Sequence, residues 1–316
     1  MRTKFFQAMD HMVLKAMELG LPDSFEASYA EAEPLDYYLE ASEVRFGLEG
    51  RQWANLLATP ADHHIPVTLR TPLGLVSSRL KLTPAQRSDA PIIFCHHGLG
   101  QRPFDFVGRY FVRPILTGEA HIISLQAPFH WRMRDPIQTG FSSLAHLHQM
   151  LAGSVVIMEA LRQALPPAPL LTVGLSLGGI ITLLHQGYYG GAAAVVPVCA
   201  SPDMAQVLLD QAARFGRTLT IDPAELRARL DFSELCLLPE DDSIFPVLAE
   251  ADLFFGYEHH RGVYGDRPVL TLPNHSHISG PRDRARIQRH IRTLFDALPE
   301  SGQNGAPALK FTTKAV

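Results

Sequence analysis

Apolar residues are distributed along the chain in patterns that predict alternating strands and helices. Four short, nearly continuous apolar runs are typical of strands buried on both faces of a parallel sheet. These runs cover residues 91–97, 120–128, 169–175 and 192–200. Apolar stripes at helical spacing cover residues 106–116 (with a break at Pro114), 143–165 and 178–189. The alternation predicts an α/β fold with a doubly wound, mostly parallel sheet.

The segment before this core carries other patterns. Apolar residues at three- and four-residue steps near the start predict that residues 1–60 form a mainly helical N-terminal extension. Two β-rich runs around Pro72 and Gly74 predict a hairpin over residues 65–82. The α/β domain itself is therefore expected to cover residues 61–298.

Further helical patterns follow the strand predicted at residues 192–200. They cover residues 204–216 and 223–232 and predict a helical cap, inserted at about 200–235 over the carboxyl edge of the sheet. The predicted order of elements ends with a strand at residues 267–273, a basic helix at 282–298 and a tail at 299–316. The tail lacks periodicity, so we expect it to be flexible.

Composition and charge exclude several classes of protein. The 316 residues are 46% hydrophobic, which is enough to bury one large core. The formal net charge of −4 is spread without long charged blocks, so nucleic acid is not an expected partner. Gln7, Asp10 and His11 interrupt the apolar stretch that a signal peptide would need, and no apolar run approaches the ~20 residues that span a bilayer. The 3 cysteines give no disulfide framework. We therefore expect a soluble, cytoplasmic protein without a membrane span.

Ser176 is the first candidate for chemistry. The sequence TVGLSLGGI, residues 172–180, places Ser176 between Gly174 and Gly178, after a buried strand and before a helix. A turn this tight would hold the serine in a strained backbone conformation with its hydroxyl at the sheet edge, and would point the amide of Leu177 toward a developing anion. The alternative is a glycine-rich bend with a solvated serine.

A second glycine loop follows the strand predicted at residues 91–97. His97 ends that strand and is followed by Gly98, Leu99 and Gly100. A loop of this kind can aim a backbone amide at a reacting carbonyl oxygen, so the amide of Leu99 is the second expected donor of an oxyanion hole. The alternative is that the glycines only form the turn.

Taken together, these features resemble the α/β-hydrolase family. The strand, the His-Gly loop, the G-x-S-x-G turn and a late histidine extend over roughly residues 65–297. The resemblance implies a serine esterase or lipase-like enzyme that needs no cofactor. It also implies a catalytic triad in the chain order serine, acid, histidine.

The resemblance places the acid in LCLLPEDDSIFP, residues 235–246. Asp242 best fits the family's pattern of an aspartate followed within a few residues by a proline, and it would accept the N–H of the histidine. Asp252 or Asp266 would serve instead if residues 235–238 are helical.

For the general base, the sequence VLTLPNHSHISGP offers two histidines after the last predicted strand. Both lie on a loop at the sheet edge, as a base that contacts serine and acid must. The resemblance favours His277, because the run from the proline at the strand end to the histidine has the family's usual length. His275 is the alternative.

The other histidines do not show the spacing of a helical zinc site, so no metal is expected. Phe129, His130 and Trp131 follow the strand predicted at residues 120–128, on the edge where substrate loops gather. They are candidates for the wall of an acyl pocket. The alternative is that they pack under the N-terminal helices.

The sequence therefore predicts a serine hydrolase that cleaves carboxylic esters of small molecules through an acyl-enzyme intermediate. Amide or peptide hydrolysis, thioester cleavage and acyl transfer could use the same groups, and a binding protein without turnover is the non-enzymatic alternative. The N-terminal extension could serve as part of a lid, as a support for the sheet or as a dimer contact, which leaves a homodimer open.

Overall fold

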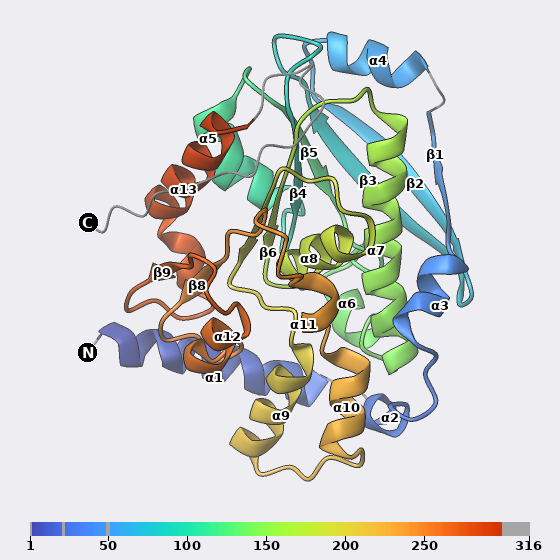
Figure 1. Ribbon diagram of the computed structural model, residues 1–316. Coiled ribbons are helices and arrows are strands. Elements are labelled where there is room, and N and C mark those ends of the chain that lie inside the picture. The colour runs from blue at the N-terminus through green and yellow to red at the C-terminus, as the bar shows by residue number, and fades with distance from the viewer. Residues whose placement is uncertain (1, 21–22, 49–50, 299–316) are drawn as a thin grey trace.

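A nine-stranded sheet forms the centre of the computed structural model, which describes residues 2–20, 23–48 and 51–298 (Figure 1). The strand order is β1-β2-β3-β5-β4-β6-β7-β8-β9. All pairings from β5 to β9 are parallel, which confirms the expected doubly wound, mostly parallel sheet. The parallel strands are β4 (Ile92–His96), β5 (His121–Leu125), β6 (Leu170–Leu175), β7 (Ala194–Val198), β8 (Val247–Ala249) and β9 (Leu270–Leu272).

The antiparallel strands lie at the other edge of the sheet. The expected hairpin forms from β2 (His63–Thr71) and β3 (Gly74–Thr83), and β3 joins it to β5. β1 (Glu43–Phe46) pairs with β2, although the helical pattern of the N-terminal segment did not predict a strand there. The sheet thus extends into the segment predicted to be mainly helical.

Helices cover both faces of the sheet. On one face lie α7 (Leu144–Ala164) and α8 (Leu177–Tyr189), whose buried side chains join the larger core cluster. On the other face, η1 (Gly108–Val112), α5 (Arg113–Leu116) and α13 (Arg284–Asp296) contribute to a second cluster. By length and composition α7 is apolar enough to cross a membrane, but 78% of its apolar window is buried inside the molecule. This burial explains the apolar composition of α7 as that of a helix packed in the core.

The helical cap expected after β7 consists of α9 (Met204–Phe215), α10 (Pro223–Leu230) and α11 (Ser233–Cys236). The N-terminal segment contains α1 (Arg2–Gly20), α2 (Ser24–Ala27), α3 (Leu35–Glu40) and α4 (Arg51–Ala58). The remaining short helices are α6 (Asp135–Gln138), α12 (Tyr257–Val263) and η2 (Gly280–Arg282). Figure 1 shows α1 near α9 and α12, and a hydrogen bond joins α1 to the loop after β8. The tail predicted to be flexible, residues 299–316, lies outside the described residues.

Candidate active site

Ser176 lies on the turn between β6 and α8, as the sequence predicts. Its backbone dihedral angles, φ 53° and ψ −118°, lie in a region that residues other than glycine rarely adopt. The side chain is partly exposed at the carboxyl end of a buried strand. The turn therefore holds the serine hydroxyl at the open edge of the sheet.

The glycines around Ser176 are required because backbone approaches backbone there. A Cβ on Gly174 would lie 2.1 Å from the carbonyl oxygen of Gly178, and one on Gly178 would lie 2.3 Å from the carbonyl oxygen of His96. Neither contact can be relieved by turning a side chain. The alternative of an ordinary glycine-rich bend does not explain so close an approach of β6, α8 and the end of β4.

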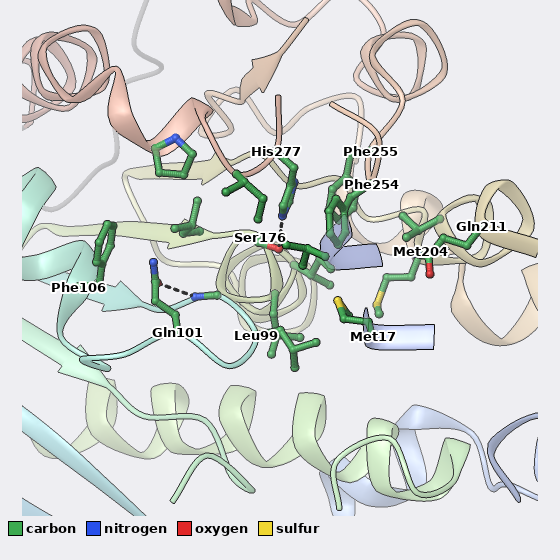
Figure 2. Close-up of a pocket in the computed structure, with 18 of the residues that line it drawn as sticks. Met17, Leu99, Gln101, Phe106, Ser176, Met204, Gln211, Phe254, Phe255 and His277 are labelled. Atoms are coloured by element: carbon green, nitrogen blue, oxygen red, sulfur yellow. Dashed lines mark hydrogen bonds between the residues drawn. The ribbon is translucent and has the colours of Figure 1, made fainter. Parts of the chain in front are cut away.

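His277 lies between Ser176 and the carboxylate of Asp252, and Figure 2 shows its ring directed at Ser176. The distance from His277 Nε2 to Ser176 Oγ is 3.0 Å, and His277 Nδ1 lies 2.8 Å from Asp252 Oδ2. Since a carboxylate can only accept, Nδ1 carries the proton and Nε2 is free to accept the serine O–H. His275 instead contacts Ser279 Oγ through Nδ1 and stacks near Phe6.

Asp252, and not Asp242, lies at the histidine. Asp242 is exposed on the turn before β8, whereas the side chain of Asp252 is buried in the loop that follows β8. The leucine-rich segment at residues 235–238 is helical as far as Cys236, where α11 ends, and none of it is a strand, so the condition under which the sequence offered Asp252 is met in part. The expected contact between Asp242 and His277 is therefore wrong.

The Asp252 carboxylate is held by backbone amides as well as by the histidine. Its Oδ1 accepts hydrogen bonds from the N–H groups of Phe254, at 2.7 Å, and Phe255, at 2.9 Å. The Phe254 ring stacks on the His277 imidazole with 4.3 Å between centroids. The acid and the histidine are thus fixed by the same short loop.

The surroundings of His277 raise its pKa. Burial is the largest effect and lowers the pKa, but the charge of Asp252, its hydrogen bond and the charge of Asp10 together outweigh burial. The net pKa lies above the ordinary value of 6.5. The carboxylates therefore favour the protonated imidazolium that a general base becomes.

The amides of Leu99 and Leu177 donate no hydrogen bond to any described atom. Both neighbours of Leu99 are already engaged, because Gly98 N–H donates to Gln101 Oε1 at 3.0 Å and Gly100 N–H donates to His130 Nε2 at 3.2 Å. A Cβ on Gly98 would lie 3.5 Å from Ser176 Cβ, so this loop passes directly beside the serine. The two amides expected to form an oxyanion hole thus remain available next to Ser176.

A mostly apolar cavity of about 470 Å³ opens at Ser176. α1, α9, the loop after β4 and the loop carrying His277 contribute to its wall. Figure 2 shows Phe106 and Gln101 on one side of Ser176, and Met17, Met204 and Gln211 on the other. The cavity therefore extends from the serine in two directions.

The residues predicted to line an acyl pocket do not line this cavity. Trp131 is 58% exposed at the surface, and Phe129 lies beside His146 with 5.8 Å between the ring centroids. His130 is buried and accepts the Gly100 amide, so it shapes the loop that carries Leu99. Burial lowers its pKa to about 4, which keeps the accepting nitrogen free of a proton. Phe129, His130 and Trp131 therefore do not line the cavity that opens at Ser176, where the sequence led us to expect them.

Within the described part of the chain, no three His, Cys, Asp or Glu side chains are grouped so that they could hold a metal ion. The arrangement around Ser176 consists of a serine hydroxyl, an imidazole, a carboxylate and two amide N–H groups that donate to no described atom. Sequence reasoning singled out all of these but ranked the acid wrongly.

Comparison with known proteins gives matches in structure alone. No family model and no curated protein sequence matches the chain. It is similar to a lipase in its open form, with a TM-score of 0.52 and 11% identity over 75% of this chain and 98% of the lipase. The complex of DcsB with its substrate analogue matches with a TM-score of 0.51 and 10% identity over 75% of this chain and 98% of DcsB.

A third match is Est1E from Butyrivibrio proteoclasticus with bound ferulic acid, at a TM-score of 0.50 and 12% identity over 70% of this chain and 96% of Est1E. The chain has the α/β-hydrolase fold. Ser176, Asp252 and His277, which the hydrogen bonds bring together, occur along the chain in the order serine, acid, histidine. All three follow strands of the parallel part of the sheet, at its carboxyl edge.

Proposed function

We propose that the protein is a serine hydrolase that cleaves carboxylic esters, with Ser176 as nucleophile, His277 as general base and Asp252 as the acid. The observation that carries the proposal is the continuous hydrogen-bonded chain from Asp252 Oδ2 through the His277 ring to Ser176 Oγ. A serine in a strained turn, facing a histidine whose tautomer is fixed by a carboxylate, is an activated nucleophile.

The reaction follows from these contacts. His277 Nε2 takes the Ser176 proton as Oγ attacks the ester carbonyl carbon, and the negative oxygen accepts hydrogen bonds from the amides of Leu99 and Leu177. Asp252 accepts Nδ1–H and stabilises the imidazolium. Collapse of the tetrahedral intermediate expels the alcohol, which receives the proton from Nε2 and leaves an acyl-serine. His277 then removes a proton from water, whose oxygen attacks the acyl carbon. Collapse of this second intermediate breaks the bond to Ser176 Oγ, which takes the proton back from Nε2 as the carboxylic acid is released.

The cavity supports a substrate with an apolar group of moderate size. Its wall is mostly aliphatic and aromatic, and Val13, Met17, Met204, Val207 and Leu208 gather where α1 meets α9. Transfer of an acyl chain from water into this region is favourable by roughly 0.8 kcal/mol per buried methylene. The structural neighbours that are a lipase and Est1E with bound ferulic acid support a carboxylic ester or acid as ligand.

The test is release of p-nitrophenol from esters of acyl chains of increasing length. We expect the wild type to hydrolyse these esters, with a preference for apolar acyl groups, and Ser176→Ala to lose about 10⁶-fold in kcat. Circular dichroism and thermal unfolding check that the variant is folded.

Ser88→Ala is the matched control, because Ser88 is an exposed serine on the loop before β4. It should keep wild-type activity. Equal rates for Ser176→Ala and wild type would exclude Ser176 as the nucleophile. A wild type inactive on all esters but active on thioesters or amides would replace the proposed substrate class.

A further inference from the structure

Asp10 is a fully buried carboxylate on α1, the first helix of the chain. No ion pair among the described residues includes it. A buried charge without an opposite charge is costly unless hydrogen bonds replace the water that it has lost. The contacts of Asp10 therefore indicate what the residue stabilises.

Four hydrogen bonds reach the two oxygens of Asp10, and all come from the loops of the proposed acid and base. Oδ1 accepts Ser276 Oγ–H at 2.7 Å and Ile278 N–H at 3.0 Å. Oδ2 accepts His277 N–H at 2.9 Å and Leu253 N–H at 3.1 Å. One side chain thus holds the backbone of His277, both neighbours of His277 and the residue that follows Asp252.

This arrangement adds to two hydrogen bonds that join the same loops closer to the sheet, from Ala251 N–H to the His275 carbonyl at 2.8 Å and from Asn274 N–H to Glu250 Oε2 at 2.8 Å. The β8 and β9 strands before them are three residues long each, and the loops leave the sheet directly after these strands. The contact between His277 Nδ1 and Asp252 depends on the separation of the two loops. Asp10 is hydrogen-bonded farther along both loops, at Leu253 and at residues 276–278, and so joins them directly beside the two residues that make this contact.

We propose that Asp10 is a positioning residue, which holds His277 and Asp252 in register for proton transfer from Ser176. The proposal rests on the function proposed above. It assigns α1 a role in the active site that the sequence pattern of the helix does not indicate. The same helix also contributes Val13 and Met17 to the cavity wall, so α1 contacts both the proposed base and the space for the substrate.

Asp10 also acts on His277 through its charge. Asp252 and Asp10 are the charged groups that act on the His277 imidazole. Burial and the same two carboxylates raise the pKa of the Cys199 thiol, just after β7, well above its ordinary value. Arg282 and Arg284 line the same cavity. Because the charge of Asp10 raises the pKa of His277, its removal should lower that pKa.

The test is Asp10→Asn, with Glu18→Gln as the matched control. Asparagine keeps the shape but offers a single accepting oxygen, so two of the four donors would face an NH₂ group. Glu18 lies on the same helix, away from the active-site cavity, where it pairs with Arg217 at 3.5 Å. Glu18→Gln should keep wild-type kinetics.

For Asp10→Asn we expect kcat to fall by about 10- to 100-fold while KM changes little, because the reacting groups are misplaced and the cavity is kept. The acidic limb of the kcat/KM profile should move to lower pH. A purely structural anchor of α1 would lower the melting temperature without moving this limb. A folded Asp10→Asn with wild-type kcat and a wild-type limb would overturn the proposal.

Two further measurements keep the test decisive. If Asp10→Asn does not fold, Ser276→Ala removes one of the four donors. We then expect a several-fold loss in kcat at unchanged KM, and a wild-type kcat would overturn the proposal. Titration of the His277 ring by NMR needs no turnover: a lower pKa in Asp10→Asn supports the role of Asp10 and an unchanged pKa contradicts it, even if the wild type hydrolyses no ester and the proposed function fails.

Discussion

The turn that carries Ser176 is shaped by close contacts between backbone segments, whereas His277 is held by side chains from distant segments. Around the serine, the glycines allow β6, α8 and the end of β4 to approach within contact of bare backbone. Around the histidine, Asp252 and Asp10 supply charge and hydrogen bonds across separations of 25 and 267 residues. The position of Ser176 is therefore fixed by steric contacts and that of His277 by charge and hydrogen bonds. Substitutions in the turn of Ser176 should affect stability, whereas substitutions of the carboxylates should affect mainly the reaction rate.

Asp252→Asn breaks the histidine side most directly. An amide at this position can no longer stabilise the imidazolium and can impose the wrong tautomer, so we expect kcat to fall by about 10⁴-fold with little loss of folding stability. Steady-state kinetics on p-nitrophenyl esters measure the effect.

Asp242→Asn is the control for the same chemical change. Asp242 is exposed on the turn before β8, so its variant should keep wild-type kinetics. If Asp242→Asn were the inactive variant and Asp252→Asn the active one, the assignment of the acid would be reversed.

Gly178→Ala breaks the serine side. The added Cβ would lie 2.3 Å from the backbone oxygen of His96, so we expect a loss in the free energy of unfolding of about 3 kcal/mol, together with a loss of activity. Denaturant unfolding measures the first effect. Gly262→Ala, with nothing within 4 Å of the added Cβ, is the control and should be neutral or stabilising by up to about 1 kcal/mol. Equal stability of the two variants would contradict a sterically built turn.

Met17→Trp tests the wall that α1 adds on the histidine side. The larger ring should shorten the cavity, so kcat/KM for long acyl esters should fall by about 10-fold relative to short ones. Met12→Trp places the same residue on the exposed face of α1, where the side chain of Met12 is 63% exposed, and should leave the chain-length profile unchanged. A uniform loss across all chain lengths would remove α1 from the substrate wall.

The smallest expected effect concerns the pH dependence of kcat/KM of the wild type. Neutral imidazole is the active form, so kcat/KM should fall as the pH decreases through the pKa of His277. The carboxylates raise this pKa, so the midpoint of the acidic limb should lie above 6.5. A midpoint at or below that value would show that Asp252 and Asp10 do not act on the imidazole as the contacts indicate.

Local features could be predicted from the sequence. The sheet was predictable because its parallel strands are buried on both faces and are therefore nearly continuous apolar runs. Ser176 was predictable because the glycines that its turn requires lie within a few residues of it. β1 was missed because its four residues alternate between exposed and half-buried positions and carry no clear apolar run.

Features that depend on long-range contacts could not be predicted in the same way. Asp242 fits the α/β-hydrolase pattern of an aspartate followed within a few residues by a proline. However, β8 is three residues long and begins only after Asp242, so the carboxylate at His277 comes from the loop that follows β8. Asp10 has no sequence signal, because its four donors lie at the other end of the chain. Trp131 and Phe129 are apolar residues on the correct edge, but they do not line the cavity.

In the proposed reaction, Ser176 forms a covalent acyl intermediate with the help of His277. A fluorophosphonate that reacts with activated serines, followed by intact-mass measurement and peptide mapping, tests it without knowledge of the natural substrate. We predict one added phosphonyl group per chain, on the peptide that contains Ser176, and none in Ser176→Ala or His277→Ala. Ester hydrolysis that survives with Ser176 unlabelled, or a label on another residue, would contradict the account.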